Sequence, residues 1–407
     1  MKNPKSSRVP DPAKVRSADS ARTAWRQLLL AALAIVLAPR AHAIQPETDK
    51  LILQGLDAAY SLDFERSASL FSEAGRLEPE HPAGPFFLAS LQWLEYSQNA
   101  DVPGTVDALE PKFNQIMDQA LERARKMYAK KHDDPEANFY LGAIYGMKGR
   151  WFLLKYKWIR AAHYGFKGYK YLKRAVELNP ECYDAYLGMG MYDYYSDTLP
   201  AVVKFAASMI VRGDKRRGLR YIQKTMEKGH YSVTEAKIFL VGILAAYEKQ
   251  PDKALQIVQE LRLQNPNNLF FVLMEMGPRL CLQDWNGAIA FGEFLAPRVR
   301  ELAYTKPHTS LFDLYLGEAY LGAKNYLRAA DTFNRCIEAA PEPKKATVTH
   351  CHLRRAQTLD LLGRRTEAVL DYTSVKERPD FFDSQNKAKQ GLKAPATYGE
   401  VLRQLQE

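Results

Sequence analysis

Residues 310–341 read SLFDLYLGEAYLGAKNYLRAADTFNRCIEAAP, and this stretch decides the fold. Its apolar residues recur at helical spacing in two runs that flank a short polar turn. Gly317 and Ala329 are small, which lets two helices of a pair approach closely, and Phe333 fills the gap between them. Pro341 stops the second helix, because proline cannot donate the next backbone hydrogen bond. The stretch therefore predicts a helical hairpin.

This hairpin resembles the tetratricopeptide repeat, a helix–turn–helix unit of about 34 residues. The resemblance is carried by Leu316-Gly317, Tyr320, Tyr326, Ala329, Phe333 and Pro341. Partial copies of the pattern fill most of the chain, at 48–81, 82–134, 135–180, 183–230, 235–266, 269–308 and 349–376. The segments 188–200, 212–220 and 234–248 are also similar to exported bacterial proteins of this repeat type that have no assigned function.

The resemblance implies an all-α fold, an α-solenoid of about seven to eight tetratricopeptide-like helical hairpins over residues 44–376. Helical insertions are expected near 98–112, 148–167 and 196–212, where the repeat period is broken. In such a solenoid each repeat packs only on its neighbours. The segment 377–407 is a polar tail. Within it, Thr397 and Glu400 form the pattern of a capping box, which predicts a final helix covering the last repeat.

Residues 1–43 have the features of a cleaved export signal. A basic leader precedes the apolar run 28–38, LLLAALAIVLA, and the small-residue pattern Ala41-His42-Ala43 follows it. The run has 11 residues, whereas a spanning helix needs about 20. We expect an exported, periplasmic protein, with membrane association, secretion or an uncleaved anchor as alternatives. The leader holds eight basic and two acidic residues, so it accounts for six of the ten net positive charges of the chain.

The positive charge of the remaining chain is concentrated in residues 146–176. This stretch holds nine basic residues, no acidic residue and eight Phe, Trp or Tyr residues. Interleaved basic and aromatic residues suit an anionic lipid surface or an acidic partner protein, and export argues against nucleic acid. Alternatively, the long Lys stems flank aromatic rings that fill a gap between repeats. The residues of this basic-aromatic patch are Arg150, Trp151, Lys155, Lys157, Trp158, Arg160, Lys167 and Lys170.

The first helix of each pair lines the concave side of a repeat solenoid, which is its usual binding surface. In this sequence that face is aromatic and aliphatic, and it lacks the Lys, Arg and Asn set that grips a peptide carboxylate. The pattern predicts a groove for an apolar peptide or helix. The alternative is that the same side chains pack within and between repeats. The groove residues are Phe139, Leu187, Met191, Tyr194, Tyr195, Phe239, Tyr247 and Leu314.

A second insertion, 198–212, reads TLPAVVKFAASMIVR and carries an apolar stripe at helical spacing. The stripe either packs over the solenoid or docks on a partner or a membrane interface.

The four cysteines do not form the framework of a small disulfide-rich protein. Cys336 falls on a second helix and Cys351 on the next first helix, so a disulfide between them is possible in an oxidising compartment. Cys182 and Cys281 have the character of small core residues. His350 and His352 flank Cys351, but residues two apart on a helix point to different sides, so no metal site is expected.

No nucleophile elbow, haem motif, phosphate-binding glycine loop or carboxylate pair stands out, so we expect neither an enzyme nor a cofactor. The sequence favours a non-catalytic scaffold or adaptor of the periplasm or cell envelope. Its partners would be envelope proteins or peptides, bound through the groove or the basic-aromatic patch. The alternative is a peripheral membrane or envelope-anchoring protein that contacts anionic lipid through 146–176 and 198–212.

Overall fold

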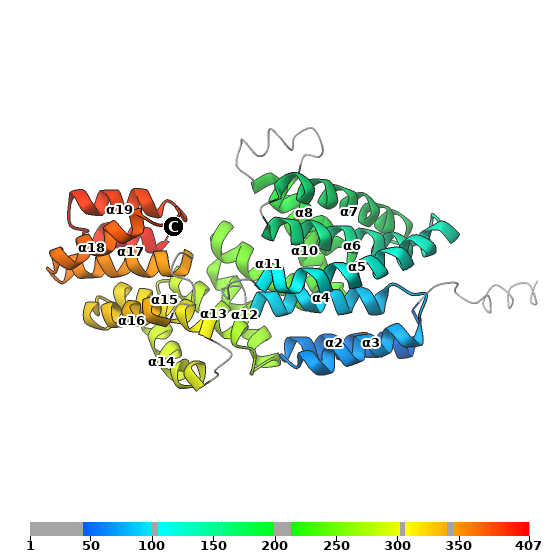
Figure 1. Cartoon of the computed structure of the whole chain (residues 1–407), viewed down its shortest axis with the longest axis horizontal. Coiled ribbons are helices and arrows are strands. Elements are labelled where there is room, and N and C mark those ends of the chain that lie inside the picture. The colour runs from blue at the N-terminus through cyan, green and yellow to red at the C-terminus, as the bar shows by residue number, and fades with distance from the viewer. Residues whose placement is uncertain are drawn as a thin grey trace, which may run out of the picture. The chain divides into compact units, whose positions relative to one another are not determined.

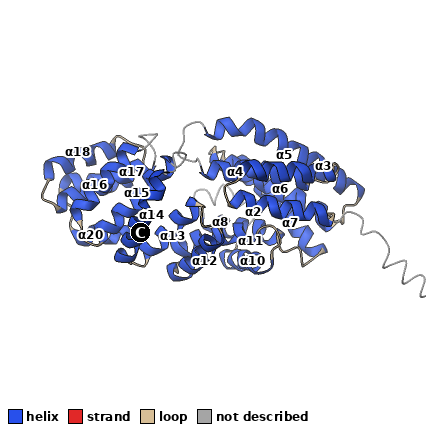
Figure 2. Cartoon of the chain, turned by 90° about the horizontal axis from the view of Figure 1, so that it is seen from below, coloured by secondary structure: helices blue, strands red, loops and turns tan. Residues whose placement is uncertain are grey.

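The computed structural model describes residues 44–98, 105–155, 157–198, 213–301, 306–339 and 346–406. Within these ranges every regular element is helical, as Figure 2 shows, which confirms the predicted all-α class. The described helices belong to one compact unit that begins at Pro46. The predicted export signal, 1–43, lies outside the described residues.

The described helices pair into eight consecutive hairpins, followed by two further helices (Figure 1). This number agrees with the seven to eight hairpins that the sequence predicts. The pairs are α2 (Pro46–Tyr60) with α3 (Phe64–Leu77), α4 (Ala83–Gln98) with α5 (Thr105–Lys130), α6 (Pro135–Leu154) with α7 (Trp158–Leu178), and α8 (Ala185–Thr198) with α10 (Lys215–Lys228). Next come α11 (Val233–Gly242), continued by the π-helix η1 (Ile243–Tyr247), with α12 (Pro251–Gln264), then α13 (Leu269–Cys281) with α14 (Trp285–Glu301). The last are α15 (Lys306–Gly322) with α16 (Tyr326–Ala339), α17 (Ala346–Leu361) with α18 (Arg365–Lys376), and the closing helices α19 (Ser384–Lys393) and α20 (Tyr398–Gln406).

Four of the hairpins are closed by a glycine on the first helix that faces a large side chain on the second, in the pairs Gly55–Phe71, Gly142–Leu172, Gly190–Ile222 and Gly317–Phe333. A Cβ atom added to Gly317 would lie 2.5 Å from Cε1 of Phe333, so no larger residue fits there without a shift. Phe333 itself is fully buried. The same relationship joins Gly190 to Ile222, where an added Cβ would lie 2.8 Å from Cγ1. The predicted roles of the glycine and the aromatic residue are confirmed.

The turn inside five of the hairpins contains one residue in the left-handed region of φ. Only one of the five is glycine, although this region favours glycine for lack of a Cβ clash. The residues and their φ angles are Leu62 (65°), Lys249 (53°), Gln283 (57°), Lys324 (60°) and Gly363 (75°).

The predicted insertion near 148–167 is no separate element, because it lengthens α6 and α7 to 20 and 21 residues. Residues 105–112 of the insertion predicted at 98–112 form the first turns of α5, which has 26 residues. Of the third insertion, 196–212, residues 196–198 lie within the described ranges, as the end of α8.

The first hairpin also contacts repeats that are far away in the sequence, which corrects the expectation of a strictly one-dimensional stack. Asn268 donates a hydrogen bond of 2.7 Å to the backbone oxygen of Tyr60, and the rings of Tyr60 and Phe271 are 6.4 Å apart. Near the start of α2, Asp49 accepts hydrogen bonds from His230, at 2.8 Å, and from the Tyr231 hydroxyl. A repeat pattern encodes only interfaces between neighbours, so it carries no signal for these contacts.

The two closing helices have different roles. α19 packs on α17 and α18, whereas α20 packs on α13 and α15 and contacts the last hairpin through hydrogen bonds from Arg354 and Gln357 of α17. The expectation that the final helix covers the last repeat is therefore met only in part, and α19 packs on both helices of that repeat. The apolar side of α20 decides its position, because Val401 is fully buried in a cluster with residues of α13 and α15. The predicted capping box is confirmed: the Thr397 amide donates to Glu400 at 2.9 Å and the Glu400 amide to the Thr397 hydroxyl at 3.4 Å.

Candidate functional site

The clearest binding surface in the described part of the chain is the one that holds α20. It is formed by the first helices of the last three hairpins, and we call it the seat of α20. Val401 and Leu405, four residues apart, share one face of the helix and join the cluster that contains Leu316 and Leu321 of α15. At the start of α20, the Tyr398 hydroxyl donates a hydrogen bond of 2.7 Å to the backbone oxygen of Gly322. The first-helix face here accepts an amphipathic helix.

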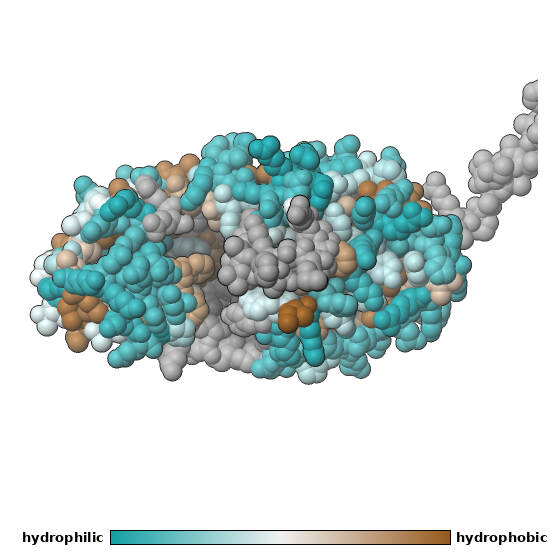
Figure 3. Space-filling view, turned by 90° about the horizontal axis from the view of Figure 1, so that it is seen from above, coloured by the Kyte–Doolittle hydropathy of each residue, from teal (hydrophilic) through white to brown (hydrophobic). Residues whose placement is uncertain are grey.

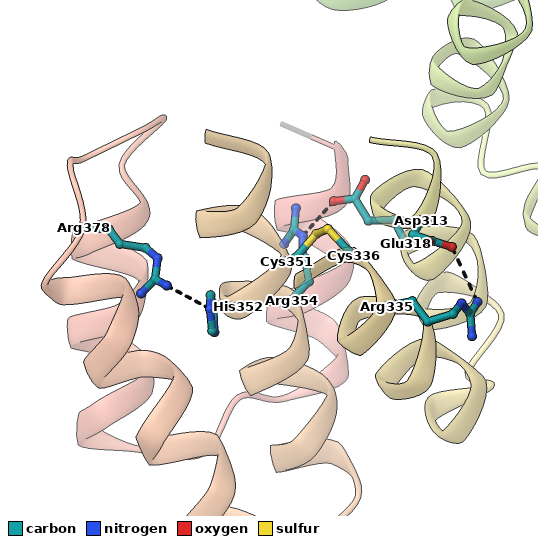
Figure 4. Close-up of a disulfide and its surroundings, with 8 residues drawn as sticks. All are labelled: Asp313, Glu318, Arg335, Cys336, Cys351, His352, Arg354 and Arg378. Carbon is teal, nitrogen blue, oxygen red and sulfur yellow. Dashed lines mark hydrogen bonds and ion pairs between the residues drawn. A yellow bond between two sulfur atoms is a disulfide. The ribbon is translucent and has the colours of Figure 1, made fainter. Parts of the chain in front are cut away.

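Polar groups of α17 hold the other end of α20. Arg354 donates through Nη2 to the backbone oxygen of Gln404 at 2.9 Å, and the side-chain amides of Gln357 and Gln404 bond at 2.7 Å. Nε of Arg354 donates to Glu318 at 2.8 Å, as Figure 4 shows, so its guanidinium is neutralised while it holds the helix. The last carbonyl groups of a helix lack internal partners, and a cation is the favoured one.

The eight residues predicted to line the groove do not form one surface. Leu187 and Tyr194 are buried together in a cluster on which Met191, Tyr195 and Phe239 pack. Leu314 is buried in the cluster that receives α20, and Phe139 packs on a third cluster around Leu172. Tyr247 is 54% exposed. Tyr247 is thus the one of these eight side chains that lies mainly on the surface.

Tyr194 shows why a tyrosine at a groove position can be part of the core. Its hydroxyl donates to Glu248 at 2.6 Å, and Lys215 pairs with the same carboxylate at 2.9 Å. Burial and this hydrogen bond raise the pKa of the Tyr194 phenol well above its usual range. The hydroxyl is a fixed donor inside the repeat.

Arg150 belongs to the first-helix face, although the sequence assigns it to the basic-aromatic patch. Its guanidinium lies 4.1 Å from the ring centroid of Trp93 and 5.2 Å from that of Phe239. Its Nη1 donates to Glu235 at 2.5 Å. The cation therefore links α4, α6 and α11. The sequence gives no indication of Trp93 or Glu235, because both lie in other repeats than Arg150, far from it along the chain.

The basic-aromatic patch is divided by acidic residues that α5 contributes. Lys155 pairs with Glu110, and Lys148 pairs with Asp118 at 2.7 Å. Trp151 is 2% exposed and stacks on Phe113 with ring centroids 4.1 Å apart. Residues 146–176 contain no acidic residue, but α5, which packs on α6, supplies Glu110 and Asp118.

Three further patch residues, Lys157, Trp158 and Arg160, lie at the turn between α6 and α7. Trp158 is 52% exposed and Ile159 88% exposed, next to the exposed side chains of Lys157 and Arg160. We call these residues, together with Leu153, the hairpin tip. Lys167 and Lys170, further along α7, lie over the rings of Tyr145 at 4.2 Å and Phe166 at 4.5 Å.

Cys336 and Cys351 form a disulfide, with Cα atoms 6.3 Å apart, that joins α16 to α17 (Figure 4). Cys182 is half-buried, but Cys281 is exposed, contrary to expectation, because it ends α13 at the turn to α14.

His352 lies between Asp371, at 2.7 Å, and Arg378, at 3.0 Å. Among the described residues, no group of three His, Cys, Asp or Glu side chains is placed to hold a metal ion.

Comparison of the sequence with protein-family models and with curated proteins finds no match. Solved structures do resemble the chain. Human IFIT1, solved as a dimer with PPP-AAAA, is 16% identical, with a TM-score of 0.43 over 89% of this chain and 87% of that one. A tetratricopeptide repeat protein from Parabacteroides merdae is 13% identical, with a TM-score of 0.27 over 86% and 98%. The Cut9–Hcn1 tetramer of the APC/C is 13% identical, with a TM-score of 0.32 over 91% and 73%.

These likenesses concern the fold alone. The hairpins themselves, with glycine against a large apolar side chain, decide the architecture. The fold is a tetratricopeptide-type solenoid.

The described surface of this tetratricopeptide-type solenoid is mainly hydrophilic on the face drawn in Figure 3, with scattered apolar side chains. No described helix is both long enough and apolar enough to cross a membrane. Three of its described features are suited to binding: the first-helix surface on which α20 packs, the Arg150 guanidinium between aromatic rings, and the exposed hairpin tip.

Proposed function

We propose that this protein is a non-catalytic scaffold that binds helical segments of partner proteins on the first helices of its hairpins. The observation that carries the proposal is the seat of α20. An amphipathic helix already lies there, with Val401 in an apolar cluster and the backbone oxygen of Gln404 held by Arg354. This is the helix-in-groove mode, in which apolar anchors spaced along one helix face enter a prepared surface.

The first helices nearer the N-terminus offer a second stretch of the same face. Tyr247 is 54% exposed, beside the buried Tyr194, at a ring distance of 6.2 Å. Arg150, held between Trp93 and Phe239, places a fixed and largely neutralised cation on this face. Exposed aromatic residues on a rigid scaffold are frequent binding anchors. A partner helix with apolar residues at i, i+3 and i+4 matches this chemistry.

The proposal can be tested with two exposed aromatic residues. Tyr247 lies on a first helix and Phe294, which is 81% exposed, on a second helix, α14. The tagged full chain, its Tyr247→Ala variant and its Phe294→Ala variant are purified from the native envelope after crosslinking, and partners are quantified by mass spectrometry. We expect partners to be lost from Tyr247→Ala and retained by Phe294→Ala. Equal recovery by both variants would contradict the proposal.

We further propose that the protein works in the periplasm or cell envelope. The leader at 1–43 has the composition of an export signal. The disulfide between Cys336 and Cys351 supports this placement, because disulfides persist in oxidising compartments. Thiol labelling tests it: cells are quenched in acid and the protein is unfolded in urea, because both cysteines are buried in the fold. The two cysteines should then resist a thiol reagent until a reductant is added. Labelling of both without reductant would contradict the placement.

One observation favours a second candidate function, that of a peripheral membrane protein. The hairpin tip exposes Leu153, Trp158 and Ile159, at 45%, 52% and 88%, beside Lys157 and Arg160. Aromatic and aliphatic side chains next to cations suit the interface of an anionic membrane. The segment 199–212, which the sequence assigns to the same role, lies outside the described residues.

Vesicle sedimentation tests this second candidate. The full chain should sediment with phosphatidylglycerol-containing vesicles at low salt and be released at high salt. The Ile159→Asp variant should lose binding, whereas Leu327→Asp, at a residue that is 67% exposed on α16, should retain it. Absence of the chain from the vesicle pellet at low salt would exclude the membrane role and leave the scaffold.

A further inference from the structure

Three helices line a polar cavity of about 430 Å³ that is open to solvent and that none of the functions above uses. α5 supplies four lining residues on one helical face, α6 supplies two and α7 supplies three. The volume lies in the range of sites that hold a small organic molecule, about 300–1,000 Å³. The lining residues are Asp118, Leu121, Glu122, Arg125, Tyr145, Lys148, His163, Tyr164 and Lys167.

The cavity carries positive charge that its acidic residues do not balance. Asp118 is occupied by Lys148, at 2.7 Å, and Glu122 by Lys126, at 2.8 Å, on the next turn of α5. Two cations of the lining, Arg125 and Lys167, are left without a share in these ion pairs. Neither has a carboxylate partner within 4.0 Å in the part of the chain that the structure describes.

Both of these cations converge on one phenol. Arg125 donates through Nη2 to the hydroxyl of Tyr145 at 3.2 Å, and Nζ of Lys167 lies 4.2 Å from the centroid of the same ring. A neutral phenol accepts a hydrogen bond but cannot neutralise two cations. Burial alone raises the pKa of Tyr145, yet hydrogen bonding from Lys167 and Arg125 outweighs burial and lowers it. The site therefore favours negative charge at this point.

We propose that the cavity between α5, α6 and α7 binds a phosphate ester, with Arg125 and Lys167 as ligands of the phosphate group. Arginine and lysine are the side chains that most often bind phosphate, because their hydrogen bonds to it are charge-assisted. The volume exceeds that of a bare phosphate ion, and Tyr164 and His163 line the remaining space for the attached polar group. The phosphate belongs either to a soluble ester or to a lipid headgroup. This proposal does not depend on the scaffold role, and a lipid headgroup in the cavity would add a second lipid contact to the membrane alternative.

Calorimetry and vesicle sedimentation test the proposal on the full chain. The soluble probes are inorganic phosphate and sn-glycerol 3-phosphate, with chloride at equal ionic strength as the control for salt. The lipid probe is a vesicle of phosphatidylcholine and phosphatidylglycerol. The variants are Arg125→Gln and Lys167→Gln, and the matched control is Lys130→Gln, which removes an exposed cation from α5 outside both the cavity and the basic-aromatic patch. Thermal unfolding without ligand verifies that each variant is folded.

We expect at least one phosphate probe to bind wild type and Lys130→Gln alike. Arg125→Gln and Lys167→Gln should each weaken binding by about tenfold or more, as for the loss of a charged hydrogen bond. Binding of the soluble probes with this residue dependence assigns the site to a free ester, and binding of the vesicle alone assigns it to a headgroup. The proposal is overturned if no probe binds, or if Lys130→Gln weakens binding as much as Lys167→Gln.

Discussion

Arg354, in the middle of α17, donates a hydrogen bond of 2.9 Å to the backbone oxygen of Gln404, fifty residues further along the chain. This bond fixes the C-terminal end of α20 on the first helices of the last hairpins, where Val401 is fully buried. The chain thus fills part of its own first-helix face with a helix. A surface that accepts one amphipathic helix is suited to accept others.

The first prediction concerns the seat of α20. Val401→Asp places a charge in an apolar cluster, so α20 should detach at a cost of up to about 3 kcal/mol. Hydrogen–deuterium exchange should then increase in α20. The exposed Arg403→Asp, on the same helix, is the control and should leave exchange unchanged. Equal exchange in the two variants would show that Val401 does not anchor the helix.

A second prediction concerns the disulfide between α16 and α17. Cys336 and Cys351 are 15 residues apart, and a loop of that length is worth about 3 kcal/mol when closed. Reduction should therefore lower the urea midpoint of wild type. Cys336→Ser/Cys351→Ser should have a low midpoint that no longer responds to reductant. A reductant effect that persists in this double variant would contradict the assignment.

The left-handed turns give a third prediction. Gly363 has a φ of 75°, so Gly363→Val should lower the free energy of unfolding by about 1–2 kcal/mol. Gln283 has a φ of 57° and is exposed, so Gln283→Gly should leave stability unchanged or raise it by up to about 1 kcal/mol. Urea unfolding measures both. Comparable destabilisation by the two substitutions would mean that these turns are not conformationally strained.

A fourth prediction concerns pH. Burial, together with the charges of Arg354 and Lys387, lowers the pKa of the His350 imidazole from 6.5 to about 4. Between these values the unfolded chain binds a proton that the folded chain does not. The contribution is therefore complete above pH 6.5 and is lost as pH falls towards 4, at up to about 1.4 kcal/mol per pH unit.

The test of this pH dependence is urea unfolding of wild type and His350→Gln across the window from pH 7 to about 4. Glutamine does not titrate, so the variant should lose less stability than wild type on acidification. Parallel losses in the two proteins would assign the acid sensitivity to other groups.

The hairpins could be predicted from the sequence because their signals are local. Gly317 and Phe333 are 16 positions apart, and the small residue, the aromatic residue and the polar turn between them repeat along the chain. The capping box of Thr397 and Glu400 is likewise encoded within four residues. Spacing of this kind depends only on helix geometry and on close packing of one helix pair.

The candidate sites could be predicted only in part, because they depend on contacts between distant segments. Charge counted along α6 and α7 does not include Asp118, which neutralises Lys148 from α5. Helical spacing alone does not separate the buried Tyr194 from the exposed Tyr247, because both occupy first-helix positions. Nor does a repeat pattern indicate that α20 returns to α13 and α15.

The most direct test of the scaffold account is site-specific photocrosslinking in the native envelope. A photoreactive phenylalanine analogue replaces Tyr247 on the first-helix face or Phe294 on the second-helix face, both of which are exposed aromatic positions. The account predicts a defined protein adduct from position 247 and none from position 294. Adducts of equal yield from both positions, or none from position 247, would contradict it.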